Sequence, residues 1–457
     1  MKCPVICDPG LGTGHSTTIS VVDQTLQLDG ACNNAMFITD EEGLANVADP
    51  TGDAYLFTNI QDGARAQVIT GVADALLHFD ADGEVVKFAR AVEENQGNGL
   101  ASFFYVGLWD KSNSETLVDA LDAIEACQPC WLPFTIAKQD KGDAAAVPPV
   151  APAPIVDTLD IDVAAAWAIA NLKFFAPGSH DVALENPIDN TNLKGRLNAL
   201  GYKTTAIEYI PAKCREIPND GRDPLVTDPI ITEDWHPYRE AMLPLYMAAI
   251  DFESFQSPYT WAYKPQSGQW VGIPVDNISG SAKVAVTGVF PDGSLNPANN
   301  GYANVYVKDY GNPGEWPGKT VTGHWIDEQH LLLWMQRRLR QIIANLMADQ
   351  RSVPYEDARG RTLILNAVSE FMTTVYNAGW FNRDAGAFTE EANYIRTGPG
   401  GAGWGLRSDS YQSVSASRRS SRVAPPLQVC FIPAGSVHVL PITLCALADP
   451  TPVFGNS

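Results

Sequence analysis

Positive charge is scarce in this sequence of 457 residues, in which 31 lysines and arginines stand against 53 acidic residues, for a net charge of -22. An acidic surface repels a phosphate backbone, so the composition argues against nucleic-acid binding. The sequence also lacks an apolar run close to the roughly 18 residues that cross a bilayer. Its first residues contain no apolar core of a signal peptide. We therefore expect a soluble protein that is made in the cytoplasm.

Cysteine is sparse as well, and the eight cysteines are an ordinary proportion for this length, not a disulfide framework. Their positions are less ordinary, because Cys3 and Cys7 lie near the start of the chain and Cys430 and Cys445 near its end. Chain termini are usually mobile, so cysteines there have little reason to pack in a core. Bonding to another chain and four inert thiols are the two interpretations.

Motifs that carry catalysis or bind metals are also missing. Cys127 and Cys130 form a C-x-x-C pair, but the motif ends a predicted helix, where the dipole disfavours the thiolate that redox chemistry needs. A zinc site would need further ligands at suitable spacing, and none is near. A local or inter-subunit disulfide and two buried thiols are the main alternatives for this pair.

Other short motifs do not change this conclusion. The segment GLGTGHST resembles a phosphate-binding loop, but His15 stands where the lysine belongs and too little chain precedes it for a buried strand. Asp234 and His236 could belong to a catalytic triad, yet the sequence has no G-x-S-x-G elbow. We expect no enzymatic activity, no cofactor and no metal site.

The chain is long enough for roughly two to four domains. Strands that alternate with helices in its middle predict a mainly parallel sheet covered by helices. Short strand signals occur at 35–39, 54–58, 84–91 and 411–416, with a helix near 64–77. We divide the sequence into an extended arm at 1–20, a β-rich domain at 21–100, an α/β middle domain at 101–320 with a loop at 140–154, a C-terminal core domain at 321–446 and a tail at 447–457.

The longest predicted helix covers residues 323–351. Its apolar residues recur at steps of three and four, the spacing of one helical face: Leu331, Met335, Leu339, Ile342 and Leu346. Arg337, Arg338 and Arg340 project from its middle. A core helix with a solvated polar face and a helix that meets an acidic partner are both consistent with this pattern.

A second predicted helix over 358–378 completes a helical hairpin, and strands at 427–432 and 436–445 predict a final β-hairpin. Between residues 321 and 423 about twelve arginines stand against about ten acids, so the negative charge lies elsewhere. An acidic body with a neutral-to-basic segment favours head-to-tail contacts between copies. The expected fold is a multi-domain α+β or α/β chain: a mixed sheet flanked by helices, the two C-terminal hairpins, and extended N- and C-terminal arms.

The C-terminal third resembles the contractile tail sheath proteins of bacteriophages, in the myophage branch. The matching segments are Gly323-His324-Trp325-Ile326-Asp327 with the long helix, Gly360-Arg361, Ala378-Gly379-Trp380, Ser413 to Ser417 with Arg418 and Arg419, Ala424-Pro425-Pro426, and Ala434 to Val439. Residues 193–211, 257–263 and 303–310 are similar to the same family in the same order. The first hundred residues match poorly.

The resemblance implies a structural subunit of stacked hexameric rings around a rigid tail tube, in an extended state that contracts to drive the tube through the host envelope for genome delivery. It implies terminal arms that add strands to neighbouring subunits. The implied partners are further copies of the chain, the tail tube protein, and baseplate, neck or tail terminator proteins, without nucleic acid or membrane insertion. The implied location is a virion tail assembled in the bacterial cytoplasm.

Two alternatives and two hypotheses accompany this resemblance. The chain could be the sheath of a phage-derived bacteriocin or secretion device, or a cytoplasmic α/β hydrolase. We hypothesise that Arg337, Arg338 and Arg340 face the tail tube or an acidic neighbouring subunit. We also hypothesise disulfides between subunits, in which Cys3 or Cys7 pairs with one of four other cysteines: Cys32, Cys214, Cys430 or Cys445.

Overall fold

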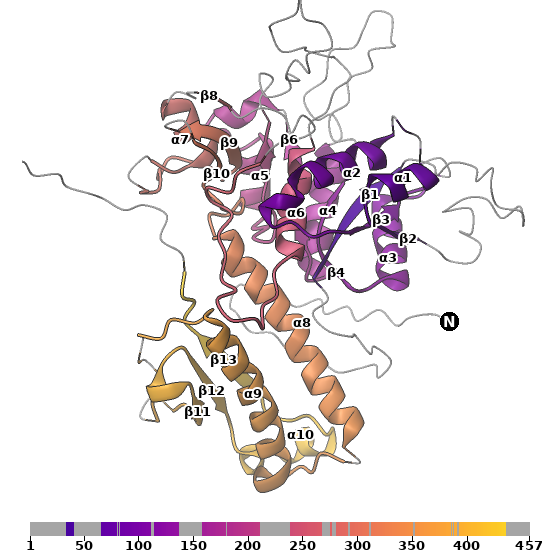
Figure 1. Ribbon diagram of the computed structural model, residues 1–457. Helices are drawn as coiled ribbons and strands as arrows, with labels where there is room; N and C mark the ends of the chain where they lie inside the picture. Colours follow the sequence, from indigo (N-terminus) through magenta and orange to yellow (C-terminus); the bar gives the residue numbers. More distant parts are fainter. Residues whose placement is uncertain are drawn as a thin grey trace, which may run out of the picture.

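The computed structural model describes residues 33–40, 65–79, 81, 83–110, 114–136, 158–179, 181–210, 238–266, 275–276, 280–290, 293–309, 312–350, 352–384, 386, 388–390 and 393–435. The predicted arm at 1–20, the loop at 140–154, the second strand of the final hairpin and the tail at 447–457 lie outside these residues. Figure 1 shows an α/β part joined to a smaller C-terminal part by one long helix.

The first sheet of the α/β part is mixed and five-stranded, in the order β2-β3-β1-β4-β5. Its strands are β1 (Asn34–Thr39), β2 (Ala66–Ile69), β3 (Phe104–Leu108), β4 (Trp131–Ile136) and β5 (Phe174–Phe175). β2 runs antiparallel to β3, and the other pairs are parallel. Residues 35–39 of the central strand β1 are all buried, as expected for a strand covered on both faces.

Helices cover both faces of this sheet (Figure 1). On β1, Phe37 belongs to a core shared with α2 (Glu84–Asn95) and α6 (Met242–Ala248). Met36 and Ile38 belong to a second core, shared with two other helices, α3 (Leu117–Cys127) and α4 (Thr158–Ala170). Successive side chains of a strand point to opposite faces of the sheet, so the apolar residues of β1 contribute to the cores on both faces. The short helix α1 (Val72–His78) packs on α2.

A second sheet has the order β10-β9-β7-β6, with β8 also paired to β9. Its strands are β6 (Gly178–Ser179), β7 (Glu208–Tyr209), β8 (Val275–Asp276), β9 (Asn304–Asp309) and β10 (Asn312–Trp316). β10 pairs with β9 in antiparallel register and is the last strand before the long helix. Two helices accompany this sheet: α5 (Leu193–Ala199), which begins at the N-cap Asn192, and α7 (Gly280–Thr287).

The long helix α8 (Ile326–Asp349) leads to the C-terminal part, where α9 (Thr362–Ala378) packs against it. A three-stranded antiparallel sheet follows, in the order β11 (Arg396–Thr397), β12 (Trp404–Ser408), β13 (Leu427–Phe431). The short helix α10 (Ala416–Ser420) lies beyond β12, beside the far end of α8 (Figure 1). The predicted mixed α+β architecture is therefore confirmed.

Three local predictions were wrong. Residues 84–91 were predicted as a strand but form the start of α2. The prediction failed because a short apolar run occurs in buried helices and in buried strands alike. The helix predicted near 64–77 is β2 followed by α1. Residues 411–416, predicted as a strand, form a 3-10 turn and the start of α10. There Ser410 and Ser415 cap the backbone, and such capping overrides an alternating pattern.

Candidate assembly surfaces

The first half of α8 is buried between the two parts of the molecule. The indole of Trp334 stacks on Phe252 at a centroid distance of 4.6 Å and contacts Phe371 of α9 at 5.5 Å. Phe252 also contacts Trp380 at 5.0 Å. One continuous apolar core therefore includes α6, α8 and α9. This core makes α8 a rigid connection between the α/β part and the C-terminal part.

A buried histidine strengthens the same junction. His330 Nδ1 lies 2.8 Å from the hydroxyl of Tyr259, and its Nε2 lies 2.7 Å from Oδ1 of Asn33. Burial lowers the pKa of His330 to about 3, so the ring is neutral. We assign its Nδ1 as the acceptor from Tyr259 and its Nε2 as the donor to Asn33, since a neutral ring has one of each. Asn33 in turn donates to the Met247 carbonyl at 2.6 Å.

The structure separates the three arginines of α8. Arg337 donates to the carbonyls of Trp131 at 2.7 Å and Pro129 at 2.6 Å, so it links α8 to the start of β4. Arg338 lies 3.2 Å from Glu253 of the same chain. Arg337 is therefore used inside the subunit, contrary to its predicted projection towards a partner. An interface role for Arg338 and Arg340 stays a prediction.

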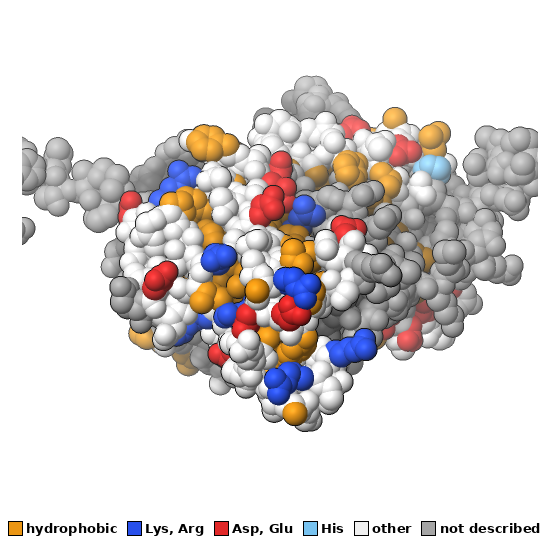
Figure 2. Space-filling view, turned by 90° about the horizontal axis from the view of Figure 1, so that it is seen from below, with side chains coloured by type: hydrophobic (Ala, Val, Ile, Leu, Met, Phe, Trp, Pro, Cys, Tyr) orange, Lys and Arg blue, Asp and Glu red, His pale blue; other side chains and the backbone are white. Residues whose placement is uncertain are grey.

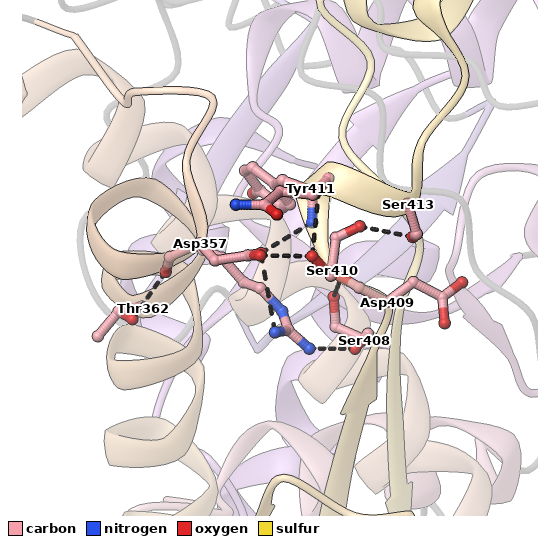
Figure 3. A network of polar contacts seen from close by, with 9 residues as sticks. Asp357, Thr362, Ser408, Asp409, Ser410, Tyr411 and Ser413 are labelled. Carbon is pink, nitrogen blue, oxygen red and sulfur yellow. Dashed lines mark hydrogen bonds and ion pairs between the residues drawn. The ribbon is translucent and has the colours of Figure 1, made fainter.

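A polar network fixes the turn between α8 and α9 against the end of β12 (Figure 3). The carboxylate of Asp357 accepts from the Tyr411 amide at 2.8 Å and from the Ser410 hydroxyl. Arg361 lies 3.8 Å from Asp357 and donates to the Ser408 carbonyl. The hydrogen bond from Ser410 is the main cause that lowers the pKa of Asp357. The network holds the segment that leads into α10.

Basic side chains accumulate on α10 and directly after it. Arg418, Arg419 and Arg422 are all exposed, and none forms an ion pair with another residue that the structure describes. Tyr355 donates to the Val423 carbonyl at 2.9 Å and ties this segment to the α8–α9 turn. Figure 2 shows the molecule from below, with Lys and Arg side chains scattered over this face and acidic side chains among them. These arginines are a better candidate for an acidic partner than Arg337.

The third sheet ends in an edge strand, β13. The Ile432 amide donates to the Gly403 carbonyl, which fixes the hydrogen-bonding alternation along the β12–β13 ladder. The backbone groups of Leu427, Val429 and Phe431 therefore point away from β12. Among the residues that the structure describes, no backbone group pairs with them. Such an edge can accept a further strand.

The cysteine hypotheses stay predictions. Cys3, Cys7, Cys32, Cys214 and Cys445 lie outside the described residues. Cys430 is a half-buried thiol on β13, and Cys127 is an exposed thiol at the end of α3, so Cys127 and Cys130 are not bonded to each other. Across the described ranges, no group of three or more metal-ligating side chains could hold a metal ion, and no helix is long and apolar enough to cross a membrane.

Sequence reasoning missed both surfaces. Residues 417–422, with the sequence SRRSSR, are a basic run in the sequence. Because they follow a segment that was predicted as a strand, the exposed helix α10 was not expected there. The edge at β13 was not predicted, because the strand was expected to pair with residues 436–445, which lie outside the described residues, and its described partner is β12. A serine three residues before Arg418 was the available signal for a helix start.

Comparison with known proteins gives a family match and similar solved structures. Residues 326–445 match a family described as E217 tail sheath protein gp31-like, C-terminal domain. A chain in the cryo-EM structure of the anti-feeding prophage (AFP) baseplate, 6-fold symmetrised, shares 12% identity at a TM-score of 0.54, covering 97% of this chain and 99% of that chain. No curated protein sequence matches.

A second solved structure is the PVC sheath complex of an extracellular contractile injection system in its contracted state. It shares 11% identity at a TM-score of 0.50, again over 97% of this chain and 99% of that chain. At such identities the likeness shows the fold alone. The resemblance seen in the sequence is thereby confirmed for its C-terminal part: residues 326–445 are similar to a tail sheath C-terminal domain, and the fold of the chain resembles those of the two solved structures.

Proposed function

We propose that this chain is the structural subunit of a contractile tail sheath, which polymerises as stacked hexameric rings around a tail tube and contracts to drive the tube through a host envelope. The family match in the C-terminal part, which carries the edge strand β13, is the observation that supports this most strongly. The subunit acts mechanically and not as an enzyme. A capsid gene beside its own gene would assign it to a phage, and the absence of one to a phage-derived particle.

The rigid α8 junction supports the mechanical role. Because one apolar core includes helices of both parts, a displacement of the C-terminal part is transmitted to the α/β part. We propose that neighbours are joined by a terminal arm that adds a strand at the outward groups of β13. Contraction would then change other interfaces, each by a few kcal/mol, while the added strand keeps the lattice connected.

Proline at position 429 tests the strand addition. Val429 has an outward amide, so Val429→Pro removes a donor to an incoming strand and leaves the β12 bonds of Gln428 and Cys430 in place. We expect loss of tubes in negatively stained samples, with a monomer that keeps its circular dichroism spectrum. The matched control Val429→Thr retains the amide and should form tubes. Normal tubes from the proline variant would contradict strand addition at this edge.

A second prediction concerns the exposed arginines of α10. The triple variant R418E/R419E/R422E should remain folded, because these side chains make no described ion pair, and should fail to assemble on tubes. The triple lysine variant keeps the charge and should assemble. Sedimentation of tubes in rising salt gives an independent check, since exposed charge contacts weaken as salt is added. Assembly of the glutamate variant at the normal protein concentration would remove α10 from the interface.

A further inference from the structure

Two glutamates face each other in the interior of the α/β part, across the second sheet. Glu208 of β7 is paired in register with Asn304, and Glu315 of β10 with Tyr306, on either side of β9. Asn304 and Tyr306 are two residues apart, so the four side chains share one face of the sheet. Both glutamates are fully buried, and each changes the pKa of the other.

The segment of residues 238–266 covers this face and supplies donors to the pair. Trp261 Nε1 donates to Oε1 of Glu208 at 2.9 Å, and Gln266 Nε2 donates to Oε1 of Glu315. The Gln266 amide also donates to the Tyr306 hydroxyl at 3.1 Å. Each carboxyl group therefore has one oxygen engaged by the 238–266 segment.

The second oxygen of each carboxyl group has no donor. Oε2 of Glu208 and Oε2 of Glu315 are buried, and no N–H or O–H group of the described residues donates to either one. A buried acceptor without a partner is costly, and two buried carboxylates in contact repel each other. One proton held between the two carboxyl groups removes both problems, because the protonated carboxyl donates to the ionised one.

The charged residues around the pair do not remove the need for this proton. Arg239 lies with its guanidinium carbon 4.9 Å from the centre of the Tyr306 ring and favours ionisation of both glutamates. Glu240 is also buried and packs beside Gly178. Burial and Glu315 raise the pKa of Glu208 well above its usual range. Burial also raises the pKa of Glu315 to about 7, with Arg239 opposing the rise.

We propose that Glu208 and Glu315 share one proton, and that this proton is a pH-sensitive lock that holds the 238–266 segment on the second sheet. The same segment carries Phe252 and Tyr259, which contact Trp334 and His330 of α8. Loss of the proton leaves two ionised carboxylates beneath the 238–266 segment. Their repulsion weakens the packing of this segment on the second sheet and thereby its contacts with α8. The lock belongs to the folded subunit and does not depend on its assembly into a sheath.

The sign of the pH effect follows from linkage. The folded chain binds the shared proton more tightly than the unfolded chain, so the stability that the lock contributes is complete at low pH. It declines as the pH rises from about 4.5, the ordinary pKa of glutamate, and the decline ends once the pair has lost its proton, where the pKa of Glu315 is about 7 and that of Glu208 is also raised. One proton per molecule corresponds to about a tenfold change in the unfolding equilibrium constant for each pH unit.

The test compares urea unfolding of the wild-type protein and the double variant E208Q/E315Q from about pH 5 to about pH 9, a range that includes the interval between the unfolded and folded pKa values. The two amides can hydrogen-bond to each other but hold no titrating proton. Burial raises the pKa of Asp327 to about 7 as well, and this residue is present in both proteins. The prediction is therefore the difference: the wild type should lose stability with rising pH more steeply than the variant, by about tenfold in the unfolding equilibrium constant per pH unit.

Infrared spectroscopy gives a readout that does not depend on unfolding. At neutral pH the wild type should show the C=O band of a protonated carboxyl, and this band should decrease in the double variant. The control E370Q removes an exposed carboxyl of α9 and should leave both the pH slope and the band unchanged. If the double variant does not fold, the band is compared between the wild type and E208Q alone. Equal pH slopes, or no carboxyl band in the wild type, would overturn the proposal.

Discussion

Replacement of Trp334 by alanine is expected to lower the free energy of unfolding by about 3–5 kcal/mol, the usual cost of removing a fully buried large aromatic side chain. Trp334 is 2% exposed and packs on Phe252 of the α/β part and on Phe371 of α9. The cavity would therefore open at the junction of the two parts. Chemical denaturation followed by circular dichroism measures the loss.

Two controls identify the cause of this loss. Phe255 is an exposed aromatic residue in the turn that follows Phe252, and F255A should change stability by no more than about 0.5 kcal/mol. W334F keeps an aromatic ring and removes the indole Nε1, which has no hydrogen-bond partner among the described residues. W334F should therefore cost less than W334A. A loss in W334A no larger than that in F255A would show that α8 is not supported by this core.

Gly360→Ala should destabilise the chain by more than about 4 kcal/mol, a loss that single substitutions rarely reach. A Cβ atom at Gly360 would lie 1.7 Å from the carbonyl oxygen of Pro354. That oxygen cannot move easily, because it accepts from the Glu356 amide at 2.9 Å, and Glu356 accepts from the Arg361 amide at 3.0 Å. The substitution would displace the turn between α8 and α9 and the Asp357 network with it.

Gly97 is the matched glycine for this experiment. An added Cβ there meets nothing within 4 Å, so G97A should leave stability unchanged or raise it by up to about 1 kcal/mol. Thermal unfolding of both variants gives the comparison. Circular dichroism at low temperature shows whether G360A has lost helix content. Equal melting temperatures for G360A and G97A would mean that the turn accommodates a side chain, against the geometry described here.

The sequence predicted α8 well because its apolar residues repeat over many turns, and a long periodic segment leaves little ambiguity. It also predicted that the second helix ends at residue 378, and Gly379 after it has the positive φ of a helix C-cap. Short segments were harder. The two-residue strands β6, β7 and β8 are held by their neighbours in the sheet, and so few residues carry no periodic signal of their own.

The candidate surfaces were predicted only in part, because side-chain partners come from distant residues. Arg337 looked exposed in the sequence, but its acceptors are the carbonyls of Pro129 and Trp131. No local pattern connects residues about two hundred positions apart in this way. The same is true of Glu208 and Glu315, which meet only because β9 lies between their strands.

The central claim is that copies of this chain assemble through strand addition at β13, and a cryo-electron microscopy map of tubes formed by the full-length protein tests it most directly. We predict stacked six-membered rings, with backbone density of a neighbouring subunit paired along Leu427–Phe431. Particles that stay monomeric at every protein concentration would contradict assembly as a sheath. Tubes in which this edge of β13 has no added strand from a neighbour would contradict the proposed connection between subunits.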